Sequence, residues 1–336
     1  MSSKINRLIY FGYYILTLDT GKLNKYLIYA SEIVQKSRFY ILADAIKAVF
    51  EFNISILDYF QFRLFEKVKS ERLKWAGTGF MFEYQRIMNP PFARERLENK
   101  VQFNCYFRSF IKREFATYQS IKSDNEITER LLKNTSHIIV LKKSLGQAGK
   151  DICFLKTKNL DSHKLLSIMK KCRYDLAEEY VIQHPEMMLL SDTGLNTVRV
   201  ITQVFSGRII ILATRLRISI NSEVDNMAAG NAAAPLDLET GIVSGPAVFS
   251  DITKPDLLCH PITGVQIIGF QVPFWRQVIR MVTKAAMMIP ENRSVGWDVA
   301  ITSQGPLLIE GNHNWCKLLW QLPVKKGLKE ELEVYL

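Results

Sequence analysis

The sequence lacks the features that mark several common classes of protein. It has only five cysteines in 336 residues, scattered and without a Cys-x-x-Cys pair, and no secretory signal sequence is visible at its start. Free thiols in this number and spacing are typical of a protein in the reducing cytosol. We therefore expect a cytoplasmic protein, with the inner face of the membrane as an alternative location.

Long apolar runs and clustered histidines are also missing. The longest apolar run, from Leu8 to Leu18, is about half of the roughly 20 residues that a membrane-spanning helix needs. The five histidines show no HxxxH or HExxH spacing, which argues against a zinc site. The net charge is +11, yet no dense Lys/Arg tract, zinc finger or RNP pattern accompanies it. We therefore expect polyanionic small molecules or a membrane surface as partners rather than nucleic acid.

The N-terminal part of the chain has a helical pattern. Apolar and aromatic residues recur at spacings of three and four, as in Leu8, Phe11 and Ile15, and Asp19-Thr20-Gly21 separates a first helix from a second. We interpret residues 1–75 as a helical leader that caps the main domain. Its aromatic and basic character leaves a second interpretation open, in which the leader contacts a membrane surface or a partner.

Beyond a connector over residues 76–98, helical and strand patterns are mixed. The small residues 227–234 indicate a loop beside a substrate. The length and composition suit a globular chain of two or three subdomains. The expected helices cover 97–118, 161–171 and 272–288, and the expected strands cover 138–141, 175–182, 196–202 and 208–220.

The clearest chemical signal lies near the C-terminus. Two apolar strands separated by Gln304-Gly305-Pro306 predict a β-hairpin, with Asp298 near its start and Glu310 and Asn312 near its end. With a three-residue loop, Asn312 falls opposite Asp298, and Glu310 is its diagonal neighbour on the same face. Two carboxylates and an amide oxygen on one face suit Mg²⁺. A two-residue loop would separate the carboxylates, and solvated charges on an ordinary hairpin are the simpler alternative.

A second signal combines a strand, a lysine and a loop of small residues. Lys142 follows the strand, and Ser144, Gly146 and Gly149 come next. Their small side chains would let backbone N–H groups approach a polyphosphate. The GK[ST] sequence of a Walker A loop is absent. Because glycine loops between strands are usually simple hairpins, a phosphate role and a structural role both stay open here.

Charged residues also lie inside two predicted strands. Glu178 and Glu179 occur within an apolar run and need partners, for which a base amine, a ribose hydroxyl or a lysine would serve. Arg199 leads one strand, and Arg215 and Arg217 share a face of the next. Facing arginines repel unless an anion lies between them, so they indicate either an anion site or an outward, solvated pair.

In chain order these segments resemble the ATP-grasp superfamily, and more narrowly its sugar-transfer-associated branch. The resemblance covers roughly residues 80–325 and does not include the leader. The chain departs from the family pattern at Asn99, Lys143, Asp151 and 228–230. The matching motifs are Asn99-Lys100, the loop 142–149, Glu178–His184, Leu195–Arg199, Val224–Asn226, His260–Gly264, and G-W-D at 296–298 with L-I-E-G-N at 308–312.

The resemblance implies an α+β fold of the ATP-grasp type, with subdomains at 79–178 and 179–336 behind a helical region at 1–78. It also implies an enzyme that holds ATP between these two α+β subdomains. The phosphates would contact Lys100 and Lys142, with Ser144, Gly146 and Gly149 in a lid, and the adenine would contact Glu178, Glu179 and Val181. One or two Mg²⁺ would bind Asp298, Glu310 and Asn312. Arg199 and Arg215 would stabilise the transferring phosphoryl group, and Asn196, Asp225, Asn226 and His260 would face the substrates.

The resemblance also implies a reaction. A substrate carboxylate would attack the γ-phosphate of ATP, and an amine would then displace phosphate from the acyl phosphate, so that the enzyme is an ADP-forming carboxylate–amine ligase. The substrates would be an amino acid or similar group and an amino sugar or glycan precursor of cell-surface polysaccharide. Two alternatives stay open: a nucleotide-binding scaffold of an envelope-polysaccharide assembly, and a kinase on the same fold.

Overall fold

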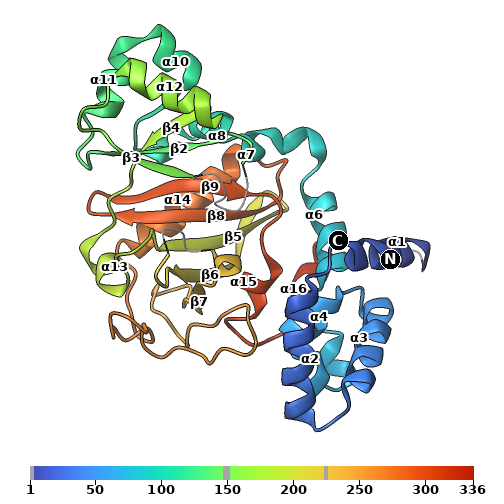
Figure 1. Ribbon diagram of the computed structural model, residues 1–336. Coiled ribbons are helices and arrows are strands. Elements are labelled where there is room, and N and C mark those ends of the chain that lie inside the picture. Colours follow the sequence, from blue (N-terminus) through green and yellow to red (C-terminus); the bar gives the residue numbers. More distant parts are fainter. Residues whose placement is uncertain (1–3, 147–151, 223–225) are drawn as a thin grey trace.

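A helical part precedes two antiparallel sheets in the computed structural model, which describes residues 4–146, 152–222 and 226–336 (Figure 1). The prediction of an α+β fold is confirmed. The proposed subdomain boundary between residues 178 and 179 falls near the end of β4 (Leu176–Glu179), which is the last strand of the first sheet in chain order. None of the described helices is long and apolar enough to cross a membrane.

The leader folds around a hydrophobic core of its own, which includes the buried aromatic residues Tyr59 and Phe60. Its helices begin where the sequence supplies a cap, because Asp19, Ser37 and Ser55 accept N–H groups of the following first turns. The helical leader is therefore confirmed. It comprises α1 (Lys4–Leu16), α2 (Thr20–Val34), α3 (Arg38–Phe52), α4 (Ile56–Gln61), the 3-10 turn η1 (Leu64–Glu66) and α5 (Lys69–Arg72).

Buried polar contacts join the leader to the C-terminal helices α15 (Lys317–Gln321) and α16 (Lys329–Glu333). The Lys317 Nζ lies 3.0 Å from Asp58 Oδ1, and Asp58 Oδ2 accepts from the N–H and hydroxyl of Thr78 at 2.7 Å each. The Gln321 side chain bonds the backbone N–H and C=O of Ala76. The two chain termini accordingly lie on the same side of the molecule (Figure 1).

The connector expected over 76–98 is wrong in its first half, because helix α6 (Thr78–Met88) forms there. A Cβ at Gly77 would lie 2.3 Å from Ile54 Cγ2, so glycine lets the start of this helix pack closely on the leader. The turn η2 (Pro91–Ala93) and the short helix α7 (Glu95–Glu98) follow the prolines.

The helix expected over 97–118 is interrupted. It divides into α8 (Lys100–Tyr106) and α9 (Arg108–Ile111), after which Lys112 adopts a left-handed conformation and strand β1 (Phe115–Thr117) begins.

The first sheet has the order β1, β4 (Leu176–Glu179), β2 (Ile138–Lys142), β3 (Cys153–Lys156). Helices α10 (Tyr118–Ser123), α11 (Asn125–Leu132) and α12 (Ser162–Cys172) lie above it (Figure 1). Because side chains alternate along a strand, Ile139 and Leu141 enter the core under these helices, and Val140 and Lys142 face the opposite side.

The second sheet has the order β7 (Ala232–Pro235), β6 (Arg208–Ile218), β5 (Thr197–Phe205), β8 (Ser294–Thr302), β9 (Gly305–Asn312). Helix α14 (Trp275–Met288) packs on one face, over a core that includes Val198 and Val299. The short helix α13 (Pro185–Leu190) precedes β5. The loop expected over 227–234 is wrong in its second half, because the buried alanines 232–234 form the edge strand β7 after a 3-10 turn, η3 (Met227–Ala229).

The β8–β9 hairpin forms as predicted, but its register differs. Thr302 pairs with Gly305, so the loop has two residues rather than three. A bulge at Ile309 then adds one residue to β9, and Asp298 pairs directly with Glu310. The predicted pairing of Asp298 with Asn312 is wrong, since Asn312 pairs with Gly296. The two-residue loop alone would place Asp298 and Glu310 on opposite faces of the hairpin. The bulge returns them to the same face.

Candidate active site

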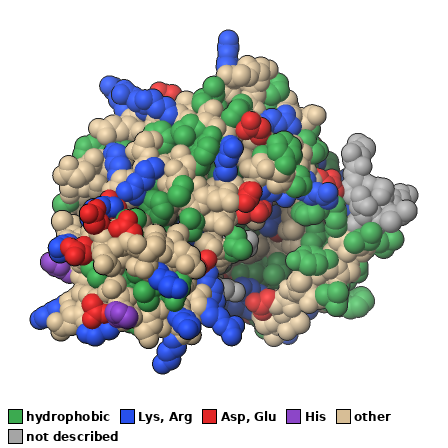
Figure 2. Space-filling model, turned by 90° about the horizontal axis from the view of Figure 1, so that it is seen from above, with side chains coloured by type: hydrophobic (Ala, Val, Ile, Leu, Met, Phe, Trp, Pro, Cys, Tyr) green, Lys and Arg blue, Asp and Glu red, His purple; other side chains and the backbone are tan. Residues whose placement is uncertain are grey.

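A cavity of about 410 Å³ lies where the two sheets face each other. From the first sheet it is lined by Lys142 and by the 178–181 segment, and from the second by Arg199, Asp298 and Glu310. Figure 2 shows the surface from above, with a hollow that has apolar side chains inside it and charged side chains around it. The cavity therefore combines an apolar interior with groups of both signs.

Two carboxyl groups, those of Asp298 and Glu310, lie side by side on the cavity wall formed by the second sheet. Asp298 is buried and Glu310 half-buried. Burial and the charge of Asp298 raise the pKa of Glu310 above its ordinary value. Asn312 Nδ2 donates to Glu310 Oε1 at 3.2 Å. Two like charges held this close oppose each other, so a divalent cation between them would be favourable.

Two arginines compensate Asp298. Arg199 contacts both carboxylate oxygens, with its Nη2 2.8 Å from Oδ2, and Arg217 Nη1 lies 2.7 Å from Oδ2. Burial alone would raise the pKa of Asp298, but these two guanidinium groups outweigh it and hold that pKa below its ordinary value. Asp298 is therefore ionised at neutral pH, whereas Glu310 is the carboxyl group of the pair that more readily keeps a proton.

Asp298, Glu310 and Asn312 stay the predicted ligands of Mg²⁺, since carboxylate and amide oxygens are the ligands that this ion prefers. Within the described residues, no group of three or more His, Cys, Asp and Glu side chains could hold a metal ion. Asp298, Glu310 and the amide oxygen of Asn312 would therefore leave positions for phosphate oxygens, as is usual for magnesium that arrives with a nucleotide. Lys100 lies near the same pair, since Glu310 is among the charges that act on its ammonium group.

The two lysines expected at the phosphates differ in their surroundings. Lys142 Nζ lies 2.6 Å from Glu178 Oε2. Lys100 begins helix α8, and its ammonium group donates to the carbonyl of Gly146. Burial lowers the pKa of Lys100. Ser144 is buried and does not line the cavity: it donates from its N–H and hydroxyl to Asp175.

Glu178 is an internal counter-ion rather than a free hydrogen-bond acceptor. Arg113 Nη2 lies 3.2 Å from its Oε1, Asn104 Nδ2 2.6 Å from the same atom, and Lys142 bonds the other oxygen. Burial alone would raise the pKa of Glu178, but Arg113 and Lys142 hold it well below the ordinary value. Glu179 is half-buried and lines the cavity with Val181, where both stay predicted contacts of the adenine.

Three predicted site residues lie outside the cavity lining and have other partners. The buried Arg215 donates from Nη2 to the Trp320 carbonyl at 2.5 Å. Asn196 is fully buried, and its amide bonds the Gln183 side chain and nearby carbonyls. His260 is also buried, with Nε2 2.9 Å from the Ser219 carbonyl. These contacts assign the three residues to the framework of the site.

The remaining predicted site residues are Asn226, Gly149 and Asp225. Asn226 lines the cavity, and its side chain accepts from the Ala228 N–H at 3.0 Å. Gly149, in the predicted lid, and Asp225 lie outside the described residues.

Arg217, which the sequence pattern did not separate from Arg215, and Arg113, which it did not single out, both line the cavity. Arg217 shares a strand face with Arg215, so the pattern alone does not distinguish them. The register places Arg215 beside Arg199, which pairs with Asp298, yet it is the Arg217 side chain that reaches Asp298. Arg113 follows a lysine and precedes a glutamate, a run that normally indicates a solvated surface, and nothing local signals its burial.

Asn99, where the resembling branch has aspartate, is the N-cap of α8. Its Oδ1 accepts from the N–H groups of Val101 and Gln102 at 2.9 and 3.2 Å. An asparagine serves this purpose as well as an aspartate, so the departure leaves the position of Lys100 unchanged.

Comparison with known proteins gives a family match. The family model described as sugar-transfer associated ATP-grasp matches residues 80–335. Among solved structures, an L-amino acid ligase from Bacillus licheniformis is 13% identical, with a TM-score of 0.39, over 77% of this chain and 52% of that one. The chain thus spans about half the length of this structure.

Two further solved structures show a similar degree of likeness. The ATP-grasp ligase PsnB, complexed with its minimal precursor, is 13% identical, with a TM-score of 0.42, over 76% and 67% of the two chains. D-alanyl-alanine synthetase A from Vibrio cholerae is 11% identical, with a TM-score of 0.38, over 66% and 56%. No curated protein matches the chain.

Proposed function

The chain belongs to the sugar-transfer-associated ATP-grasp family, and from this premise we propose that it is an ATP-dependent, ADP-forming ligase that joins a carboxylate to an amine. The observation that carries the proposal is the charge arrangement of the cavity. Asp298 and Glu310 line the wall formed by the second sheet, Lys142 lines the wall formed by the first sheet, and Lys100 lines the cavity from the start of α8. Carboxylates suit Mg²⁺ and ammonium groups suit phosphate oxygens, so the two walls together match Mg·ATP.

The apolar part of the cavity supports a place for the base. Val140, Phe154 and Ile309 line it beside Val181. The adenine would lie among these side chains, with its exocyclic amine toward Glu179 or the backbone that follows β4. Lys142 can turn from Glu178 to a phosphate, because Arg113 and Asn104 still compensate Glu178.

In the proposed reaction, an oxygen of the substrate carboxylate attacks the γ-phosphorus of ATP, ADP leaves and an acyl phosphate forms. The amine then attacks the acyl carbon, loses a proton and displaces inorganic phosphate. Asp298, Glu310 and Asn312 would hold Mg²⁺, which would supply charge neutralisation for the phosphates. Arg199 and Arg217 end at Asp298 on the cavity wall, where they stabilise the transferring phosphoryl group and the later oxyanion. The chain contributes positioning and charge rather than a covalent group.

We also propose that the carboxylate is an amino acid or a similar group and that the amine belongs to an amino sugar or a glycan precursor of cell-surface polysaccharide. The support for this part is the family's association with sugar transfer.

A contact of the leader with the inner face of the membrane completes the proposal. Helix α1 has no acidic residue, and Leu8, Ile9, Tyr13 and Leu16 are exposed on one face of it. Sedimentation with anionic vesicles tests this contact, and the double variant Leu8→Ser/Leu16→Ser should lose it. Equal sedimentation of both proteins would exclude α1 as the contact.

The ligase itself is tested by ADP release with Mg·ATP against a panel of amino acids combined with amino sugars, with Glu310→Gln as the inactive control. Turnover that requires both substrates and stops in the variant supports the ligase. Nucleotide binding without turnover on the full panel would indicate the scaffold instead. A stable phosphorylated product without an amide would indicate the kinase, and failure to bind ATP would overturn all three.

A further inference from the structure

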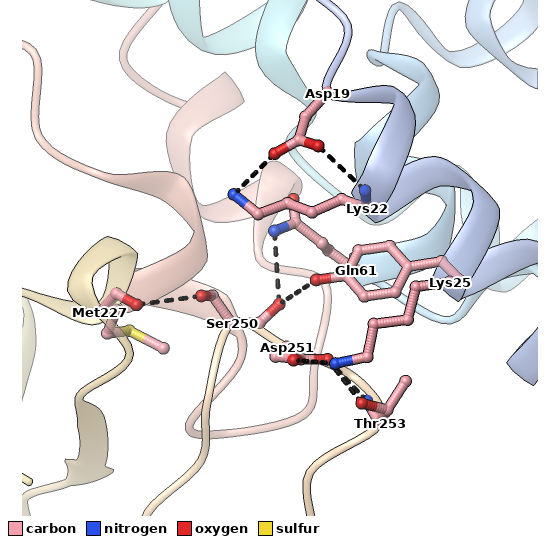
Figure 3. Close-up of polar contacts among 9 residues, drawn as sticks. Asp19, Lys22, Lys25, Gln61, Met227, Ser250, Asp251 and Thr253 are labelled. Carbon is pink, nitrogen blue, oxygen red and sulfur yellow. Dashed lines mark hydrogen bonds and ion pairs between the residues drawn. The ribbon is translucent and has the colours of Figure 1, made fainter.

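A second cavity, also of about 410 Å³, lies between the leader and the turn η3 (Figure 3). Helix α2 and Gln61 line it from the leader, and η3 and the 250–254 segment line it from the other side. We call this second cavity the leader cleft. Met227 lines both the leader cleft and the candidate ATP cavity, and Asn226 beside it lines the latter. The two cavities therefore share η3 as a wall.

Ser250 connects the shared turn η3 to the leader by hydrogen bonds. Ser250 donates from its hydroxyl to the Met227 carbonyl at 3.1 Å. The Ser250 carbonyl in turn accepts from the Tyr26 hydroxyl at 3.3 Å and from Gln61 Nε2 at 3.4 Å, and Figure 3 shows Gln61, Ser250 and Met227 in this chain of contacts. A ligand in the leader cleft would thus contact the turn that borders the ATP cavity.

Lysines dominate the charge of the leader cleft. Lys22 Nζ lies 3.3 Å from Asp19 and Lys25 Nζ 2.6 Å from Asp251, with side chains 56% and 51% exposed. Lys254 Nζ lies 4.5 Å from the centre of the Phe249 ring. Ion pairs this exposed contribute little stability, so an incoming anion can recruit the ammonium groups. The three lysines exceed the two lining aspartates in charge.

The floor of the leader cleft is open. Gly21, Ala228 and Gly230 line it, and none of them projects a long side chain. A Cβ added at Gly230 would meet no atom within 4 Å, which shows the free space beside the turn. The leader cleft therefore has room for a bulky group next to its cations.

We propose that the leader cleft binds the phosphate or diphosphate group of the amine substrate, through Lys22, Lys25 and Lys254, while the amine reaches the ATP cavity past Met227. This inference rests on the proposed ligase function. A lysine ammonium is a compact charge that suits phosphate oxygens without demanding the planar geometry of an arginine contact. The phosphate ester could belong to a soluble sugar phosphate or to a lipid, and the experiment separates the two.

The test is amine labelling of the full chain with peptide mass spectrometry, in the presence of Mg²⁺ and a non-hydrolysable ATP analogue that occupies the ATP cavity. Inorganic pyrophosphate is the soluble probe, and phosphatidic acid vesicles are the lipid probe. We expect pyrophosphate to slow labelling of Lys22, Lys25 and Lys254 about tenfold, the size of one charge-assisted hydrogen bond. Lys133 and Lys164, which are also exposed and ion-paired, are the matched controls and should not change.

The outcomes separate the leader cleft from the ligase. Protection of Lys25 by pyrophosphate that disappears in Lys22→Gln/Lys254→Gln, while labelling of the control lysines and thermal unfolding stay unchanged, supports the anion subsite even if no ligase turnover is found. Protection by vesicles alone assigns the phosphate to a lipid. Equal effects on the cleft and control lysines, or no protection by either probe, would overturn the proposal, including in a chain that proves to be an active ligase.

Discussion

Asp298 lies directly opposite Glu310 in the β8–β9 hairpin, because the bulge at Ile309 shifts the register of β9 by one residue. The two arginines on Asp298, the Asn312 amide on Glu310 and the raised pKa of Glu310 offset the repulsion between the two carboxyl groups. The geometry that suits Mg²⁺ is therefore unfavourable for the protein alone, as is common where function and stability compete.

The first prediction concerns Glu310→Gln. Removing one of two opposed carboxylates should raise the free energy of unfolding of the nucleotide-free protein at neutral pH by up to about 1 kcal/mol, because like charges directly opposite each other on paired strands are destabilising. The same change should lower ADP release at least about 100-fold, because a magnesium ligand is lost. Urea unfolding and ADP release measure the two effects, with the exposed Glu291→Gln as the control. A variant that is less stable yet active would contradict both expectations.

The second prediction separates two arginines of one strand. Arg217→Met should lower the rate of turnover by about 10- to 100-fold, because Arg217 lines the cavity and, in the proposed reaction, stabilises the transferring phosphoryl group. Arg215→Met should instead lower the free energy of unfolding by about 1–3 kcal/mol, because the Trp320 carbonyl loses its donor. Steady-state kinetics and urea unfolding on both variants decide the matter. The opposite result, with lost turnover in Arg215→Met and lost stability in Arg217→Met, would indicate that Arg215 acts on the phosphoryl group.

The third prediction is a pH dependence. Because the folded-state pKa of Glu178 lies below the ordinary 4.5, its ionisation stabilises the protein above that pH. This contribution is lost as the pH falls through the folded pKa. The wild type should therefore lose more unfolding free energy than Glu178→Gln between about pH 6 and pH 3.

At neutral pH, Glu178→Gln should cost about 3–5 kcal/mol, because Arg113 keeps a buried charge without its counter-ion. Urea titrations across this pH range measure both effects, with the neighbouring Glu179→Gln as a control of small effect. Parallel curves for wild type and Glu178→Gln would show that Glu178 is not the titrating group.

The fourth prediction concerns the junction between leader and α15. Asp58→Asn should destabilise the protein by about 3 kcal/mol, since it leaves the buried Lys317 ammonium without its counter-ion. The exposed pair of Lys164 and Asp161 is the control, and Asp161→Asn should change stability by less than about 1 kcal/mol. Urea unfolding measures both. Equal effects would mean that the buried pair does not join the two parts of the chain.

Much of the fold was open to prediction from local pattern. The leader helices, strand β2, helix α12, the β5–β6 pair and the final hairpin each depend on residue types within a few positions, and each was found. The sequence pattern missed the end of α9 and the start of α6, because each depends on the backbone conformation of one residue or on a contact with a distant residue. Lys112 ends α9 in a left-handed conformation, and α6 forms because Gly77 fits against Ile54.

The sequence by itself determined which residues this protein has available for chemistry: an acidic pair near its C-terminus, a lysine before a small-residue loop, and arginines on adjacent strands. Only the tertiary structure decided which of them meet. Arg199 reaches Asp298 across 99 positions and Arg113 reaches Glu178 across 65, and in the leader cleft Tyr26 reaches Ser250 across 224. Such contacts follow from strand register and from how the sheets and the leader pack, which no local pattern encodes.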